Sequence, residues 1–225
     1  SKYSATFSAV MLLSMEQNYK LYFAGRQVEF IPEYAECNPA DALHMVLPST
    51  GKLDTMLLES AVNSGARKIS FRCADVMASW TAFVDQFHFV AAAGGCVVNS
   101  KGDILFIHRL ERWDLPKGKV EPGEDIVVAA VREVEEECSI HGLDVLGHLI
   151  DTWHTYVQDG AQMIKRTSWF EMTYVGNETP KPQQEEGITA VRWASRNEWS
   201  DLVRHSFPSV GDVVHVFSEK GNAAR

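Results

Sequence analysis

Residues 118–140 constrain the fold of this chain most, because they join a glycine loop to a predicted helix that is acidic on one side. Glu133, Glu136 and Glu137 are spaced i, i+3 and i+4, so a rotation of about 100° per residue brings them to one narrow arc. A different arc carries apolar residues and is expected to face a core: Val127, Val131, Val134 and Cys138. The spacing therefore predicts a helix over residues 124–138 with one packing face and one carboxylate face.

Three like charges on one arc repel one another, so this acidic face needs a compensating charge. A divalent cation is the simplest one. Because the side chains offer only oxygen ligands, the site favours a hard ion such as Mg²⁺, which keeps several waters and completes its shell with substrate phosphates. The alternative is an ordinary acidic amphipathic helix whose glutamates are solvated, as most glutamate-rich helix faces are. The glycine loop and Arg132, at their fixed spacing, favour the metal site over that alternative.

At these residues the chain resembles the Nudix hydrolase family, whose box reads G-x5-E-x7-R-E-U-x-E-E-x-G-U with U aliphatic. The matching positions are Gly118, Glu124, Arg132, Glu133, Val134, Glu136, Glu137 and Ile140. Ser139 departs from the glycine that the box expects at the helix exit. A left-handed backbone there would cost a serine about 1 kcal/mol, so the departure concerns the exit geometry and not the ligand set.

The resemblance implies an α/β (α+β) fold, with a Nudix-like mixed sheet sandwiched by helices, and a pyrophosphohydrolase activity. It also implies that the three box glutamates and the Gly118 carbonyl hold Mg²⁺, with Mn²⁺ as a substitute. Such an ion bridges phosphates and lowers the pKa of a bound water. Arg132 is expected to orient the carboxylates through charge-assisted hydrogen bonds and to be scaffold more than catalyst.

The general base is left open by the sequence. In the family it can be a box glutamate or an acid on a later loop, and the pair Glu185 and Glu186 is the best placed of the loop acids. We prefer Glu186. The alternative is that both are solvated loop charges, as loop acids usually are.

Residues 113–119, Trp-Asp-Leu-Pro-Lys-Gly-Lys, resemble the W-x-L-P-K-G segment of family members that act on dinucleoside polyphosphates and diphosphoinositol polyphosphates. Lys117 and Lys119 can meet phosphate oxygens beside the glycine loop, and Arg109 at a strand end is a similar candidate. For each lysine a solvated side chain is the alternative. Trp113 is a candidate to stack on a base, although aromatic residues near a core more often pack. The same applies to Trp153 and Tyr156, and His108, Lys165 and Arg166 are weaker candidates.

The expected substrate is a nucleoside diphosphate derivative, and the 113–119 segment favours a dinucleoside polyphosphate or a related compound. ADP-ribose or another sugar nucleotide is the next candidate, because the box reads only the diphosphate and loops read the attached group. A non-catalytic nucleotide-sensing module is an alternative of a different class. It is disfavoured because every box carboxylate is present.

Composition fits a cytoplasmic enzyme with a small phosphorylated substrate. The net charge of −9 argues against an extended nucleic-acid surface, which usually needs a basic face. The absence of any run of 18 apolar residues argues against a membrane span. Four scattered cysteines with no C-x-x-C pair favour reduced thiols over disulfides or metal ligands: Cys37, Cys73, Cys96 and Cys138.

We expect three parts: a weakly ordered extension over residues 1–14, a small N-terminal α/β module over 15–88, and the Nudix-like hydrolase domain over 89–225. The module has no recognised chemical group, its lone His44 is more often a core residue than a ligand, and pairing subunits into a homodimer is one hypothesis for its role. The pattern predicts strands at 19–23, 27–31, 42–47, 68–72, 90–98, 103–110, 147–154, 163–175 and 188–193. It predicts further helices at 53–64, 75–86, 198–204 and 210–218.

Overall fold

The computed structural model describes residues 18–35, 42–47 and 55–223 of the 225-residue chain. The chain divides into two compact units, Ser1–Phe87 and His88–Arg225. The predicted extension over residues 1–14 and Cys37 lie outside the described residues. Each unit has its own set of buried side chains.

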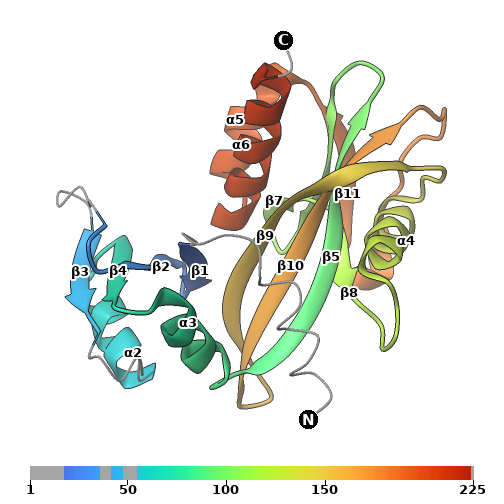
Figure 1. The fold of residues 1–225 in the computed structure, drawn as a ribbon. Coiled ribbons are helices and arrows are strands. Elements are labelled where there is room, and N and C mark those ends of the chain that lie inside the picture. The colour runs from blue at the N-terminus through green and yellow to red at the C-terminus, as the bar shows by residue number, and fades with distance from the viewer. Residues whose placement is uncertain (1–17, 36–41, 48–54, 224–225) are drawn as a thin grey trace. The chain divides into compact units, whose positions relative to one another are not determined.

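The first unit is a small α/β structure with strand order β1-β2-β4-β3 (Figure 1). Its elements are β1 (Tyr19–Phe23), β2 (Arg26–Pro32), β3 (Ala42–Val46), α2 (Thr55–Asn63), β4 (Lys68–Cys73) and α3 (Val76–Val84). The predicted hairpin of β1 and β2 is confirmed as an antiparallel pair, whereas β2 and β3 both run parallel to β4. The predicted helices are also confirmed, except that residues 53 and 54 lie outside the described part.

Aromatic side chains fill the core between α3 and the strands of the first unit. The Phe30 ring lies 5.5 Å from the Trp80 ring, 5.3 Å from the Phe83 ring and 5.7 Å from the Phe71 ring, centroid to centroid. All four side chains are buried. Rings that pack edge to face or tilted at such distances stabilise a small core that has few residues to bury.

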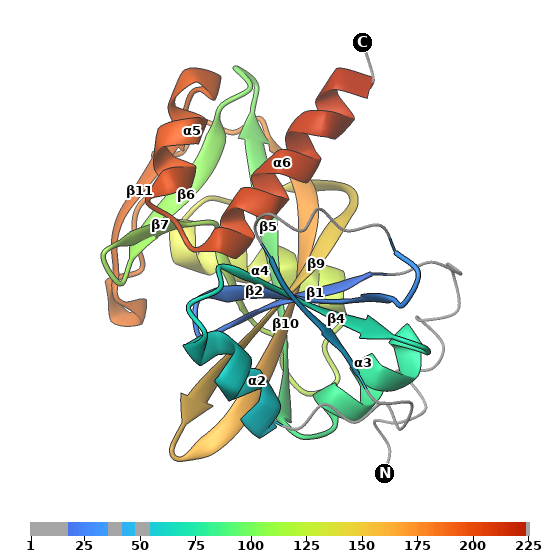
Figure 2. The same ribbon diagram turned by 90° about the vertical axis from the view of Figure 1, so that its left-hand side faces the viewer.

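The second unit is built on a mixed sheet with strand order β11-β6-β5-β10-β9 (Figures 1 and 2). Its strands are β5 (His88–Asn99), β6 (Ile104–Arg109), β7 (Arg112–Asp114), β8 (Lys117–Lys119), β9 (Asp144–Gln158), β10 (Ala161–Tyr174) and β11 (Ile188–Ala194). β5 and β10 are parallel, and the other pairs are antiparallel. The short strands β7 and β8 pair with β6 and β5 respectively.

Helices cover both faces of this sheet, as the fold class predicts (Figure 1). On one face α4 (Ile126–Cys138) packs in a cluster that includes Val97, Leu105 and Met172. On the other face α5 (Arg196–Arg204) and α6 (Pro208–Ala223) pack in a cluster that includes Phe106 and Trp169. The mixed sheet sandwiched by helices is therefore confirmed.

The packing face of α4 differs from the predicted apolar stripe. Val134 and Cys138 are buried as predicted, but Val127 and Val131 are only partly buried, and two alanines complete the buried face. The helix lies close to the sheet at Gly95, where an added Cβ would come within 3.0 Å of the Val134 side chain. Ala129 and Ala130 at the contact allow this close approach, and the larger Val127 and Val131 lie toward the edge of the interface.

β9 and β10 form one long antiparallel hairpin, which the sequence pattern indicated only as two shorter strands. The turn between them contains Asp159 and Gly160, both with positive φ (50° and 77°). Asp and Gly tolerate the left-handed backbone that tight hairpin turns require, so this turn sets the register of the pair. The three-residue strands β7 and β8 were not predicted, because periodicity is not recognisable over so few residues.

Two further expectations concern cysteines and membrane spans. Cys73, Cys96 and Cys138 are free and buried, and burial raises the pKa of each thiol. Among the described residues, no helix combines the length and apolarity needed to cross a membrane.

Candidate active site

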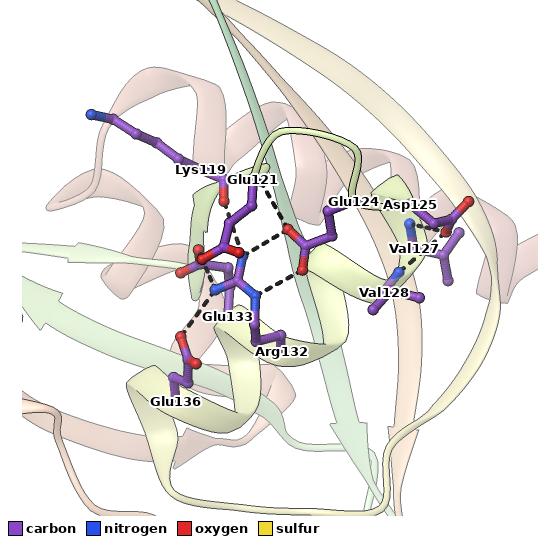
Figure 3. Close-up of polar contacts among 9 residues, drawn as sticks. All are labelled: Lys119, Glu121, Glu124, Asp125, Val127, Val128, Arg132, Glu133 and Glu136. Carbon is purple, nitrogen blue, oxygen red and sulfur yellow. Dashed lines mark hydrogen bonds and ion pairs between the residues drawn. The ribbon is translucent and has the colours of Figure 1, made fainter.

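The start of α4 is fixed by its N-cap. The Asp125 carboxylate accepts hydrogen bonds from the backbone N–H groups of Val127 (2.9 Å) and Val128 (3.3 Å) (Figure 3). These bonds satisfy two of the free N–H groups of the first turn. Because the first residue of the helix is fixed, the positions of the glutamates two turns later are fixed as well.

The helix ends at Ser139, which occupies the position of the box glycine. Its backbone is left-handed (φ 52°, ψ 46°), and its N–H donates to the Glu135 carbonyl at 2.8 Å. Serine therefore keeps the exit geometry that glycine adopts more easily. The next carbonyls of the helix accept from a distant loop: Lys181 N–H bonds the Cys138 carbonyl at 2.8 Å and Gln183 N–H bonds the Glu137 carbonyl at 3.1 Å.

These two bonds attach the loop of residues 175–187 to the end of α4. Glu178 strengthens the attachment, because its carboxylate accepts from the His141 backbone N–H at 2.8 Å and lies 3.1 Å from the His141 Nδ1. The 3-10 turn η1 (Gln184–Glu186) follows directly. The preferred base Glu186 is therefore carried by a loop that is bonded to the same helix as the box glutamates.

Arg132 connects the box carboxylates. Its Nε and Nη2 donate to the two oxygens of Glu124 at 2.8 and 3.0 Å, and its Nη1 donates to Glu133 at 2.9 Å and to Glu136 at 3.0 Å (Figure 3). Nη2 also donates to the Lys119 carbonyl at 3.1 Å. The hydrogen bond from Arg132 holds the pKa of Glu124 at about 2, and the same bond raises the pKa of Arg132. A bidentate guanidinium–carboxylate pair of this kind is among the strongest polar contacts in proteins.

Glu124 was not among the predicted site residues, although it matches the box. Its signal in the sequence was its fixed distance of eight residues from Arg132, which brings the two side chains together across the loop and first turns of α4. Glu124 also accepts from the Glu121 backbone N–H at 2.9 Å and so closes the glycine loop. Its contacts make it a structural part of the site.

Glu133 lies directly over the loop glycine. A Cβ added to Gly118 would sit 1.8 Å from Glu133 Oε2, so only glycine allows the carboxylate this position. The side chain is largely buried, and burial raises the pKa of Glu133 while Arg132 lowers it. Nearby Glu136 and Glu186 add to the rise by repulsion. The predicted ligands Gly118 and Glu133 are thus brought into direct contact.

Glu137 is buried, in contrast to the solvent-facing flank that the spacing alone suggested. Only 2% of the residue is exposed; Oε2 accepts from the Lys117 backbone N–H at 2.8 Å, and Oε1 lies 3.6 Å from Arg109 Nη1. Burial raises the pKa of Glu137 to about 7, against the lowering effect of Lys117 and Arg109. Arg109 also lies 3.4 Å from Glu186 and so links the helix acid with the loop acid.

The predicted metal ligands do not converge on one point in this structure. Glu136 is half exposed and bonded to Arg132, whereas Glu137 faces Lys117 and Arg109. Consistent with this, no group of three or more acidic, histidine or cysteine side chains in the described ranges is arranged as a metal site. The separation has a physical reason: the Arg132 guanidinium lies between the carboxylates of Glu133 and Glu136.

The donor chemistry and the charge nevertheless fit a hard divalent ion. The cluster contains more carboxylates than guanidinium groups: Glu124, Glu133, Glu136, Glu137 and Glu186 against Arg109 and Arg132. All available side-chain donors are oxygens, and Mg²⁺ or Mn²⁺ would supply the missing positive charge.

Of the predicted phosphate-binding residues, Arg109 lies against the acids Glu137 and Glu186, whereas the two lysines are on β8. Lys117 and Lys119 alternate with Gly118 on β8, so their side chains point to the sheet face opposite Glu133. Figure 3 shows the Lys119 side chain directed away from the carboxylates. The Lys117 ammonium is not free, because it donates to Asp114 at 2.5 Å.

Lys165 on β10 adds a fourth cation to Arg109, Lys117 and Lys119. Burial, and after it repulsion from these three neighbours, lowers the pKa of Lys165 to about 8. His154, opposite Lys165 on β9, is also affected: burial lowers its pKa to about 4. We name these four cations the basic face. It is suited to an anion with several charges.

The aromatic candidates for base stacking are engaged with neighbours. Trp113 packs edge-on against the His108 ring at 5.0 Å and lies 5.6 Å from the Arg192 guanidinium. Tyr156 and Trp153 lie under cations: Lys165 Nζ is 5.6 Å from the Tyr156 ring, and the Arg166 guanidinium is 5.9 Å from the Trp153 ring. These contacts agree with the alternative that the three aromatic side chains pack against neighbours and do not stack on a base.

Outside the site, both ring nitrogens of His44 are buried and find no hydrogen-bond partner in the described part of the chain.

Comparison with known proteins gives the following matches. The model of the NUDIX domain matches residues 88–210. The RNA pyrophosphohydrolase of Nitrobacter winogradskyi is 26% identical over 143 residues, which cover 53% of this chain and 83% of that protein. The RNA pyrophosphohydrolase of Bradyrhizobium sp. strain ORS 278 is 32% identical over 114 residues, which cover 42% of this chain and 67% of that protein. A crystal structure of a C. elegans Ap4A hydrolase binary complex matches with a TM-score of 0.49 at 22% identity, covering 60% of this chain and 98% of that chain.

Proposed function

This chain belongs to the Nudix family, and on that premise we propose that it is a Mg²⁺-dependent pyrophosphohydrolase of a dinucleoside polyphosphate or a related nucleoside diphosphate derivative. The activity class is supported by the family match and by relatives named RNA pyrophosphohydrolase. The single observation that carries the substrate is the basic face, in which Arg109, Lys117 and Lys119 act electrostatically on Lys165 while Arg109 lies 3.6 Å from Glu137. A chain of several phosphates matches that number of cations better than one diphosphate does.

Each predicted residue has a role in this proposal. Glu133, Glu136 and Glu137, with the Gly118 carbonyl, would hold the ion. A bound Mg²⁺ would supply positive charge for the phosphate oxygens and acidify a water for attack. Arg132 keeps the carboxylates in position through its bonds to Glu124, Glu133 and Glu136.

The residues around the acids would handle the substrate and the proton. Arg109 and the lysines of the basic face bind phosphate oxygens of the substrate equally in the ground state and in the transition state. Glu186 accepts the proton of the attacking water, and its contact with Arg109 at 3.4 Å holds it near Glu137. Trp113 on β7, just ahead of the box, is the candidate to contact a base of the substrate, and its ring packs against His108 and Arg192.

The experiment that tests the proposal is a substrate panel with a matched pair of variants. Purified protein is incubated with Mg²⁺ and diadenosine tetraphosphate, ADP-ribose or a nucleoside triphosphate, and the products are separated by chromatography. We expect fastest turnover of the tetraphosphate, and a fall in kcat of about 10²-fold or more for Glu136→Gln. Glu135→Gln, one residue away on α4, is the control, because the Glu135 carboxylate accepts from the Gly142 backbone N–H at 3.0 Å and not from Arg132 among the described residues. An unchanged rate in Glu136→Gln would remove its role as a ligand.

A second candidate substrate is the 5′ end of an RNA chain, because both reported relatives are named RNA pyrophosphohydrolase. The net charge of −9 weighs against long RNA, since only the basic face would attract it. A short 5′-triphosphate RNA belongs in the same panel. Faster turnover of this RNA than of the tetraphosphate would establish the second candidate.

We propose further that residues 89–225 hold the whole hydrolase site and that the module over residues 15–88 pairs subunits into a homodimer. All the site residues named above lie in the second unit, and the family match begins at residue 88. Light scattering on the full chain and on a chain beginning at Phe89 measures the oligomer in each case. A full chain that is monomeric at micromolar concentration would exclude the homodimer.

A further inference from the structure

Asp114 is a buried carboxylate at the end of β7, in the segment that precedes the box. It is 4% exposed, and both of its oxygens are used. Oδ1 accepts from the Leu115 backbone N–H at 2.8 Å, and Oδ2 accepts from the Lys117 ammonium at 2.5 Å. A buried charge needs a partner of this kind, and Lys117 is the ion-pair partner that the structure provides.

Lys117 is held at both of its ends. Its backbone N–H donates to Glu137 Oε2 at 2.8 Å, while its ammonium is drawn to Asp114. The main chain around it cannot shift easily, because the Gly95 N–H bonds the Pro116 carbonyl at 3.1 Å and a Cβ on Gly94 would meet Lys117 Cβ at 2.5 Å. The Lys117 backbone on β8 is fixed by its pairing with β5. The position of the Lys117 ammonium is therefore decided by the carboxylate with which it pairs.

Glu137 is the second carboxylate beside Lys117. Its Oε2 accepts from the Lys117 backbone N–H at 2.8 Å, whereas the ammonium pairs with Asp114. Asp114 also acts electrostatically on Lys165 and His154, which places it at the basic face. An ammonium paired with Asp114 belongs to the basic face, whereas one paired with Glu137 would occupy a box carboxylate.

We infer that Asp114 is a positioning residue that holds the Lys117 ammonium on the basic face and keeps it from pairing with Glu137. The inference rests on the proposed function, because it assigns Lys117 to the phosphates and Glu137 to the metal. Asp114 touches neither substrate nor ion and acts through Lys117. Removal of its charge frees the ammonium to neutralise Glu137, and this harms the reaction more than loss of the lysine itself.

The test is a double-mutant cycle of Asp114→Asn, Lys117→Met and the double variant, with kcat and KM measured on diadenosine tetraphosphate in Mg²⁺. Asp114→Asn is expected to lower kcat about 30-fold, because the freed ammonium pairs with Glu137. Lys117→Met is expected to raise KM about tenfold and to leave kcat within about threefold of the starting protein. In the double variant kcat returns to the Lys117→Met value, since no ammonium is left to pair with Glu137.

A purely structural role of Asp114 cannot produce this recovery. If the kcat losses of the two single variants add in the double variant, or if Asp114→Asn keeps its full kcat, the inference is overturned. Asp103→Asn, in the turn between β5 and β6, removes the same charge far from the site and is the control. Thermal unfolding of every variant shows that the kinetics are measured on folded protein.

Two safeguards keep the outcome decisive. If Asp114→Asn does not fold, Asp114→Glu retains the carboxylate and is expected to keep kcat within about threefold, and a loss of 30-fold or more in this variant overturns the inference. If the starting protein hydrolyses none of the substrates in the panel, the proposed function fails. If it is active and the cycle is additive, only the role of Asp114 fails.

Discussion

The acidic flank of α4, formed by Glu133, Glu136 and Glu137, and the basic face of the sheet differ in how their charges are partnered. Arg132 donates four hydrogen bonds to three carboxylates, and its guanidinium stays charged at any pH that leaves the protein folded. The basic face consists mainly of lysines, and one of them, Lys165, has its pKa lowered to about 8. Asp114 is the carboxylate that pairs with a lysine there.

This difference in partners indicates what the acidic flank and the basic face each contribute to ligand binding. A guanidinium fork fixes carboxylates in a given arrangement before any ligand arrives. Neighbouring lysines that repel one another hold a surplus of positive charge, and an arriving anion relieves that repulsion. The acidic flank therefore holds its carboxylates in a fixed arrangement, and the basic face attracts a negatively charged ligand.

The largest expected effect comes from Gly118→Ala, which tests whether the acidic flank depends on geometry. The added Cβ would sit 1.8 Å from Glu133 Oε2, and the flexible carboxylate would have to move away from its place over the loop. We expect kcat to fall about 100-fold while the thermal midpoint changes little, because a misplacement of about 1 Å has this effect in active sites. Steady-state kinetics and a melting curve measure the two quantities. Gly102→Ala, in the turn between β5 and β6, is a distant glycine control for kcat, and a full rate in Gly118→Ala would contradict the geometric requirement.

Lys165→Met tests whether the basic face attracts charge. Loss of one cation is expected to raise KM for diadenosine tetraphosphate about tenfold and to leave kcat nearly unchanged. In the starting protein Lys165 is charged below pH 8 and loses its proton as the pH rises through about 8, so KM should rise over that interval. The variant should lack this part of the pH dependence. A KM that stays constant in Lys165→Met would show that the lysine does not meet the substrate.

The same variant should be more stable than the starting protein. Burial disfavours the charged form of Lys165, and three neighbouring cations repel it. Methionine fills a similar volume without charge, so we expect the free energy of unfolding to rise by roughly 1 kcal/mol at pH 7. Urea unfolding measures it. A loss of stability would mean that the contact of Lys165 with Tyr156 outweighs the repulsion.

The smallest effect is expected from Ser139→Gly, at the C-terminal end of α4. Serine is left-handed there (φ 52°), and glycine adopts this backbone without a steric cost. The free energy of unfolding should rise by about 0.5 kcal/mol with kcat and KM unchanged, since the N–H bond to the Glu135 carbonyl is retained. Ser64→Gly, in the first unit, has no such backbone and serves as a comparison. A decrease in stability would show that the serine side chain contributes more than the strain costs.

Much of the second unit was predictable, because its signals are local. The predicted strands at 90–98 and 103–110, the helix at 124–138 and the closing helices all correspond to elements of the structure. The box positions Gly118, Glu124, Arg132 and Glu133 come together because i, i+3, i+4 spacing and one loop suffice to place them. The boundaries of β9 and β10 were wrong because half-exposed strands have weak patterns at their ends.

The sequence by itself determined the acidic helix and its family, since these depend on residues at most about twenty apart. Only the tertiary structure decided that Glu137 is buried, that Lys117 pairs with Asp114, and that Lys165 joins the basic face. These three outcomes depend on which strands are neighbours and in which register, and no local pattern encodes such a pairing. Burial and the approach of distant charges then shift each pKa, so the chemistry of the site is set by the assembled sheet.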